Sequence, residues 1–156
     1  MRKSLYVLSF LAAGTLYSCS QGSEQKAEVG ATKLDSANMQ CYAAADGVDS
    51  ASLKLITDKD GKVTGSLLIN YLEKGDSHGE LLGKFKGDTL FVDYSFQIGN
   101  TNETFYKNPL AFLKKDGKLL MGVGQIETFL GKSSFVDNSK ISFDRGRFIF
   151  APEECK

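Results

Sequence analysis

Few residues of this 156-residue chain could carry out acid–base chemistry, because it contains a single histidine, His78. His78 lies in the polar stretch 73–79, where Asp76 could orient it as a base and Ser77 is its neighbour in sequence. Side chains adjacent in sequence seldom face each other productively, and no strand-to-helix nucleophile elbow surrounds this serine. We therefore expect a solvated loop histidine and predict no catalytic residue.

Cofactor and metal signatures are also missing from the sequence. Residues 131–133, Gly-Lys-Ser, lack the earlier glycine of a phosphate-binding loop. Residues 58–61, Asp-Lys-Asp-Gly, lack the downstream ligands of a calcium loop and are typical of a turn. The 19 basic and 19 acidic residues balance, so no basic surplus indicates nucleic-acid binding. We predict no cofactor, no metal and no nucleic-acid partner.

The first of three cysteines, Cys19, follows a segment with the features of a secretory signal. Two basic residues precede the apolar stretch 5–16. As a helix this stretch would rise about 18 Å, against a hydrocarbon core of about 30 Å, so it is too short to span a membrane and is typical of a signal peptide. Leu16, Ser18 and Cys19 resemble the bacterial lipobox, whose cysteine is acylated and becomes the new N-terminus. The sequence thus predicts a lipoprotein signal peptide over 1–18 and a lipid on Cys19, with a plain signal peptide as the alternative.

The segment that follows, 19–38, holds few large apolar side chains. It cannot bury enough surface to fold alone. We predict a flexible tether that connects a folded domain, 39–156, to a membrane in which the acyl chains are anchored.

The two remaining cysteines, Cys41 and Cys155, lie near the two ends of the predicted domain. Export places them where disulfides persist. The chain-entropy model values a bridge that closes more than about 100 residues at about 4 to 5 kcal/mol before native strain is subtracted. Zinc would need further ligands at close spacing, and a redox role would favour a C-x-x-C motif. Since both are missing, we predict a structural disulfide between Cys41 and Cys155.

From residue 39 onward, apolar and polar side chains alternate. Within 89–96, for example, one face carries Leu90, Val92, Tyr94 and Phe96. This period of two is typical of strands with one buried face, and Gly-Asp at 87–88 and Asp-Gly at 116–117 are typical of tight turns. The predicted strands are 39–44, 50–57, 62–72, 79–86, 89–97, 104–114, 118–127 and 140–151, the last with a break at 144–146.

About eight sequential strands joined by short turns predict an antiparallel meander. A meander of this length usually closes, because closure removes its exposed edges. The predicted fold is all-β: a small up-and-down barrel of the lipocalin or calycin type, with a β-sandwich as the alternative.

Aromatic side chains are abundant, with eleven Phe and six Tyr. Several fall at strand positions that alternation sends to one face, and Tyr71, Tyr94 and Phe96 are the candidates for lining a ligand pocket. A filled core explains the same pattern, and small barrels do both.

An ordered set of features in this chain resembles a known family. Besides the lipobox and tether, they are Cys41-Tyr42, Asp49-Ser50, Gly61-Lys62-Val63-Thr64-Gly65, Asn70-Tyr71-x-Glu73-Lys74, Gly87-Asp88-Thr89-Leu90, Tyr94-x-Phe96 and Cys155. Together they look like the small uncharacterised lipoproteins of the Bacteroidota. The resemblance implies an envelope location and a calycin-like barrel, and it brings no established activity.

Two further expectations follow from that resemblance. Asp35-Ser36-Ala37 matches the short pattern that resembles the O-glycosylation site of this phylum, so Ser36 is a candidate for modification. Surface-exported lipoproteins of the phylum carry several acids just after the acylated cysteine, whereas residues 20–24 contain one. We therefore expect an outer-membrane anchor with the domain facing the periplasm, and the cell surface as the alternative.

Three functional hypotheses result. The first is a non-enzymatic, lipid-anchored protein that binds a small apolar or amphipathic ligand inside its barrel. The second is a filled barrel that contacts another envelope protein, as an inhibitor or assembly factor, through the loops 73–78 and 98–103. The third, and least favoured, is an enzyme that uses His78.

Overall fold

The structure is a computed structural model that describes residues 38–101 and 103–156. The predicted signal peptide, the lipid site Cys19, the tether up to residue 37 and the glycosylation candidate Ser36 lie outside the described residues. Among the residues it does describe, no helix is long and apolar enough to cross a membrane.

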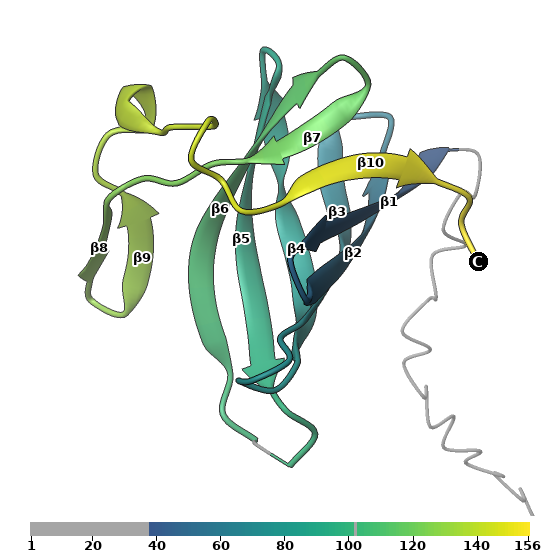
Figure 1. Cartoon of the computed structure of the whole chain (residues 1–156). Coiled ribbons are helices and arrows are strands. Elements are labelled where there is room, and N and C mark those ends of the chain that lie inside the picture. The colour runs from purple at the N-terminus through teal and green to yellow at the C-terminus, as the bar shows by residue number, and fades with distance from the viewer. Residues whose placement is uncertain (1–37, 102) are drawn as a thin grey trace, which may run out of the picture. The chain divides into compact units, whose positions relative to one another are not determined.

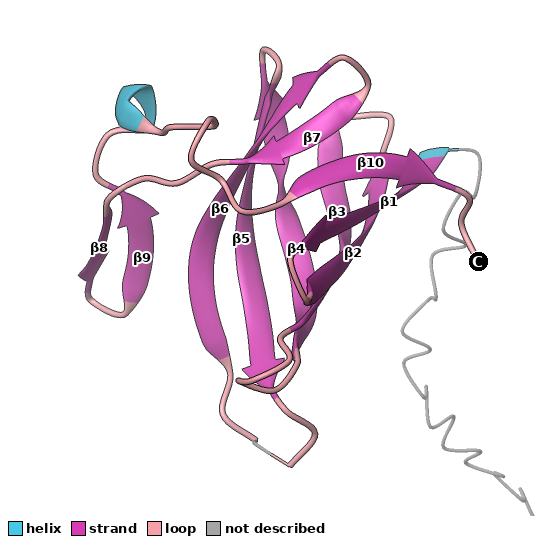
Figure 2. Ribbon diagram, in the orientation of Figure 1, coloured by secondary structure: helices cyan, strands magenta, loops and turns pink. Residues whose placement is uncertain are grey.

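Strands make up most of the described chain (Figure 2). They are β1 (Met39–Asp46), β2 (Asp49–Thr57), β3 (Lys62–Asn70), β4 (Ser77–Lys86), β5 (Thr89–Ile98), β6 (Tyr106–Lys115), β7 (Lys118–Met121), β8 (Ile126–Phe129), β9 (Lys132–Phe135) and β10 (Ile149–Glu153). One short 3-10 helix, η2 (Asn138–Lys140), follows β9.

Eight of these strands close into an antiparallel barrel in the order β1-β10-β7-β6-β5-β4-β3-β2 (Figure 1). From β1 to β7 each strand pairs with its neighbour in sequence, and β10 closes the ring between β7 and β1. The predicted all-β fold, a small up-and-down barrel of calycin-like form, is confirmed, and the β-sandwich alternative is wrong.

The alternation in the sequence sends one face of each strand into the barrel. The interior is packed by Tyr42, Ala44, Ala51, Leu53, Leu55, Val63, Leu67, Ile69, Leu81, Leu90, Val92, Tyr94, Phe112, Leu119, Phe148 and Phe150. A Cβ at Gly83 would lie 1.9 Å from the carbonyl oxygen of Phe91, so glycine is required where β4 and β5 approach so closely.

The tight turns lie where the sequence predicted them. Asp116 and Gly117, between β6 and β7, have φ values of 51° and 75°, the left-handed conformation that a two-residue hairpin needs at both positions. In the turn 58–61, one carboxylate oxygen of Asp58 accepts the backbone N–H groups of Asp60 and Lys62 at 2.9 and 2.8 Å. Side chain and backbone therefore both determine where these strands reverse.

The C-terminal third differs from the prediction. The predicted strand 118–127 ends at Met121, and the predicted strand 140–151 is reduced to β10. Between them the chain forms a separate hairpin, β8–β9, which lies outside the barrel and contacts β6 (Figure 1). Its turn, Leu130-Gly131, has positive φ at both residues, and leucine is an unusual residue there.

A close backbone approach at Gly146 precedes the shortened last strand. A Cβ at Gly146 would lie 1.7 Å from the carbonyl oxygen of Met121, so the returning chain crosses close to the end of β7 before it forms β10. The prediction of a break at 144–146 was correct, but the part before the break makes only an isolated bridge, between Val123 and Ser142.

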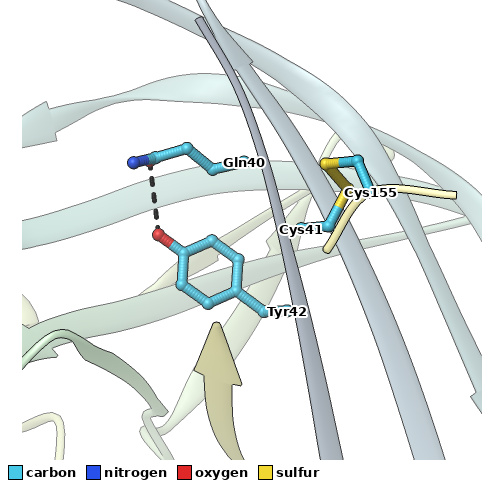
Figure 3. The surroundings of a disulfide bond; sticks show 4 residues. All are labelled: Gln40, Cys41, Tyr42 and Cys155. Atoms are coloured by element: carbon cyan, nitrogen blue, oxygen red, sulfur yellow. Dashed lines mark hydrogen bonds between the residues drawn. A yellow bond between two sulfur atoms is a disulfide. The ribbon is translucent and has the colours of Figure 1, made fainter. Parts of the chain in front are cut away.

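The predicted disulfide is present. Cys41 on β1 and Cys155, just beyond β10, are bonded, with their Cα atoms 5.2 Å apart and 114 residues between them in sequence. Figure 3 shows the bridge on one side of β1 and Tyr42 with Gln40 on the other. Since Tyr42 packs in the core, the disulfide lies outside the barrel wall and joins the two strands at which the ring closes.

Candidate functional site

The two ends of the barrel are built differently. At one end, which we call the base, the connections are the turns 58–61, 87–88 and 116–117. At the other end, which we call the mouth, the connection 71–76 between β3 and β4 is longer. Met39, the first residue of β1, pairs with Ile56 near the base. The described chain therefore enters the barrel at the end opposite the mouth.

A cavity of about 360 Å³ opens inside the barrel at the mouth. Side chains of β3 to β7, of the 71–76 connection and of the segment just before β10 surround it. The lining residues are Ile69, Tyr71, Lys74, Gly75, Ser77, Tyr94, Phe96, Ile98, Asn108, Leu110, Met121 and Arg147. Toward the base the interior is filled, with Leu90, Phe112 and Leu119 almost fully buried. The barrel is thus packed over most of its length and hollow at one end.

All three aromatic residues singled out from the sequence, Tyr71, Tyr94 and Phe96, line this mouth cavity. The rings of Tyr94 and Phe96 stack with centroids 4.6 Å apart and planes 9° apart. Phe96 also contacts Tyr106 on β6, with centroids 5.6 Å apart. Tyr106 does not line the cavity, so the stacked rings of Tyr94 and Phe96 form its aromatic wall, which suits contact with an apolar molecule.

The Tyr94 hydroxyl is held at the bottom of the cavity. It donates to the carbonyl oxygen of Leu67 at 3.0 Å, which leaves it free to accept from Ser77 Oγ at 3.1 Å. Burial raises the pKa of Tyr94, so this hydroxyl stays protonated. Because these two hydrogen bonds link the Tyr94 hydroxyl to β3 and β4, they fix the position of the Tyr94 ring in the cavity wall.

Arg147 lies at the rim of the cavity, and the sequence reasoning missed it. Its Nε donates to Asp46 at 2.5 Å and its Nη2 to Asp49 at 2.8 Å. Its guanidinium also lies 5.9 Å from the ring centroid of Tyr71 and 5.5 Å from that of Phe148. These contacts tie the start of β10 to the β1–β2 turn at the mouth.

The same contacts shift the acid–base equilibria of the pair. The hydrogen bond from Arg147 and then the backbone N–H of Leu72, which donates at 3.0 Å, hold the pKa of Asp49 below its usual value. The hydrogen bonds to Asp49 and Asp46 raise the pKa of Arg147. No local sequence motif indicates these contacts, because about a hundred residues separate Arg147 from Asp46 and Asp49 in the sequence.

His78 is not in a loop, so that prediction is wrong. It is the second residue of β4, and it pairs with Leu68 and Gln97 in the neighbouring strands. Ser77 beside it is buried in the interior, so alternation directs His78 to the outer face. There it borders a shallow surface depression with Cys41 and Glu153. It therefore lies on the opposite side of the wall from the mouth cavity.

Two other features of the described residues are weaker candidates for a site. A wider groove of about 760 Å³ lies on the outer wall, but most of the residues that line it are polar or charged, among them Lys54, Glu80, Asp93 and Lys132. Within residues 38–101 and 103–156, no group of three or more His, Cys, Asp or Glu side chains could hold a metal ion. The mouth cavity is the best candidate because aromatic side chains line it together with a few polar groups, whereas no aromatic side chain of the described residues lines the outer groove.

No family model matches this chain, and neither a curated protein nor a solved structure matches it significantly.

Proposed function

We propose that this chain is a lipid-anchored bacterial envelope protein that binds one small apolar or amphipathic molecule in its mouth cavity and catalyses no reaction. One observation carries the proposal: a hollow of about 360 Å³ remains in an otherwise filled barrel, with Tyr71, Tyr94 and Phe96 in its wall. Its volume falls within the range of about 300 to 1,000 Å³ typical of small-molecule pockets.

The preorganised wall supports binding. The Tyr94 ring is fixed by hydrogen bonds to two neighbouring strands, and Phe96 stacks on it. A ligand would therefore meet side chains that are already ordered, which lowers the entropic cost of binding.

The anchored part of the proposal rests on the sequence, through the lipobox and the resemblance to Bacteroidota lipoproteins. The first described strand, β1, begins at the end of the barrel opposite the mouth. We expect Cys19→Ser to move the protein from the membrane fraction to the soluble fraction on cell fractionation. Retention of this variant in membranes would contradict acylation at Cys19.

A second function, the interaction module, is favoured by one surface feature. The tip of the β8–β9 hairpin exposes Phe129 and Leu130, whose exposed fractions are 76% and 90%. Paired apolar residues so exposed at the end of a projecting hairpin are typical of contacts with another molecule. In this alternative the partner is another envelope protein and the mouth cavity has no cargo.

Matched substitutions inside and outside the barrel test the carrier. N-phenyl-1-naphthylamine, a neutral dye that fluoresces in apolar surroundings, is titrated into the purified oxidised protein. Leu110→Trp fills the mouth cavity, whereas Leu82→Trp adds the same group on the exposed outer face of β4. We expect the dye to bind the wild type and Leu82→Trp, and Leu110→Trp to lose at least about tenfold in affinity.

Two controls keep the test clear. Met121→Phe is a second, smaller filling substitution in the same cavity, and melting curves show which variants fold. Native mass spectrometry of protein purified gently from a periplasm looks for a retained mass that is lost on denaturation. A bare mass together with equal dye binding by Leu110→Trp and Leu82→Trp would overturn the carrier and favour the interaction module.

A further inference from the structure

The charged side chains that line the mouth cavity are both cationic, although carboxylates lie behind them. Among the described residues that line it, the charged side chains are Lys74, on the β3–β4 connection, and Arg147, before β10. None of the lining residues is a carboxylate, although Glu73 and Asp76 flank Lys74 in the sequence.

The two cationic side chains differ in their ion pairs. Arg147 is engaged by Asp46 and Asp49, which fix its position and offset its charge. Two of its N–H groups are committed to these carboxylates, and a guanidinium carries five, so about three remain for other acceptors. It can thus donate hydrogen bonds at the rim without moving.

Lys74 has no such partner: within the described part of the chain it forms no ion pair. It lies close enough to Asp49 to contribute, after Arg147 and Leu72, to lowering the pKa of that carboxyl. Asp46 and Asp49 together carry two negative charges against the one positive charge of Arg147, and Lys74 balances this cluster without an ion pair of its own. Its ammonium group therefore remains available to an acceptor in the cavity.

The rest of the lining divides into an apolar wall and a polar rim. Tyr94, Phe96 and Leu110 supply the apolar surface, while the Asn108 amide is a further hydrogen-bond donor. A molecule that matched this arrangement would place an apolar body against the rings and an acceptor-rich, negative group beside Lys74.

We propose that the molecule held in the mouth cavity is an organic anion: a compact apolar body with one carboxylate, sulfonate or phosphate group beside Lys74 and Arg147. This rests on the proposed carrier function and narrows it to a chemical class. The anionic group gains a charge-assisted hydrogen bond from Lys74 and one from Arg147 at the rim.

Two dyes that differ in a single group test the proposal on the purified oxidised protein. 1-Anilinonaphthalene-8-sulfonate is N-phenyl-1-naphthylamine with a sulfonate added, so the ratio of their affinities isolates the negative charge. We expect the wild type to bind the sulfonate more tightly than the neutral dye, and added salt to reduce that preference because ions screen exposed charges.

A pair of lysine substitutions locates the effect. Lys74→Met removes the charge at the cavity and keeps a side chain of similar length, and Lys59→Met makes the same change in the turn at the base. We expect Lys74→Met to lower the sulfonate-to-neutral affinity ratio by about two- to fivefold, as for an exposed charge pair, and Lys59→Met to leave it unchanged.

The outcomes separate the two proposals. If the wild type binds the neutral dye as tightly as the sulfonate, or if Lys59→Met changes the ratio as much as Lys74→Met, the anionic ligand is refuted and the carrier stands. If neither dye binds, the proposed carrier function is refuted, and the proposal of an anionic ligand, which rests on it, is refuted as well.

Discussion

The barrel has a continuous wall, from β1 to β6, and a short seam, where β10 joins β7 to β1. In the wall the ladders run without interruption; for example, Ser50–Thr57 of β2 pairs residue by residue with β3. At the seam, β10 meets β7 only at Ile149–Leu120 and Phe150–Leu119. Its ladder with β1 covers only Ala151, Pro152 and Glu153.

The difference follows from sequence distance. Each pair of wall strands is joined by a short connection, so little chain entropy is lost when the two strands meet. At the seam, β10 and β7 pair residues about thirty positions apart, and β10 and β1 pair residues about a hundred apart, so closure costs more chain entropy there. It is reinforced at both ends: by the Cys41–Cys155 disulfide toward the base and by Arg147 with Asp46 and Asp49 at the mouth. Side-chain and covalent links thus replace the missing ladder.

The largest expected effect comes from removing the disulfide. In the double variant Cys41→Ser and Cys155→Ser we expect the free energy of unfolding to fall by about 2 to 5 kcal/mol, because the unfolded chain regains a long open loop. Urea denaturation of wild type and variant at one pH measures this change.

Reduction is the matched control for that variant. A reducing agent should destabilise the wild type by a similar amount and leave the double variant unaffected. If reduction leaves the stability of the wild type unchanged, the seam does not depend on its covalent link and the comparison with the wall is wrong.

An intermediate effect is expected in the wall, at the hydroxyl that ties β5 to β3 and β4. Tyr94→Phe leaves the Leu67 carbonyl and Ser77 Oγ without their buried partner, which should cost about 1 to 3 kcal/mol. Tyr42→Phe is the control, because its hydroxyl donates to Gln40 over 3.3 Å in a less buried setting, and we expect a smaller loss. Equal losses in thermal or urea unfolding would show that the Tyr94 network adds nothing to the wall.

The smallest effect concerns the ionic link at the mouth end of the seam. The pKa of Asp49 is lower in the folded chain than its unfolded value of about 3.9. Its ionised form therefore stabilises the fold above that value, and the stabilisation is lost as pH falls through the folded pKa. We expect the melting temperature of the wild type to exceed that of Asp49→Asn at neutral pH, and the gap to narrow on acidification.

Asp60→Asn, in the exposed turn at the base, controls for the loss of one negative charge and should show little difference at any pH. A gap between wild type and Asp49→Asn that stays constant from neutral to acid pH would mean that shape, and not charge, makes the Asp49 contact useful.

The sequence predicted the strands of the continuous wall more accurately than those of the C-terminal part of the chain. In the wall, alternation and turn residues act over a few positions, so the strands β1 to β6 lie close to their predicted bounds. The hairpin β8–β9 was missed because its strands are short and exposed and its turn is Leu130-Gly131. The signal available was that glycine, at the second place of a two-residue turn.

The site divides in the same way. Tyr71, Tyr94 and Phe96 could be chosen in advance because alternation directs them to the inner face, and the structure places all three at the mouth cavity. Arg147 could not be chosen in advance, because Asp46 and Asp49 contact it only when β10 has closed the ring. Nor could the sequence reveal that the interior is filled toward the base and hollow at the mouth.

The sequence by itself determined the all-β class, the antiparallel order of the wall and the partner of each cysteine in the folded domain. These depend on local alternation, on turn chemistry and on there being one possible pair. Only the tertiary structure decided where the ring closes, which side chains surround the cavity and which charges face it. Those features depend on the register and stagger of strands far apart in the chain, and packing sets them only when the whole barrel has formed.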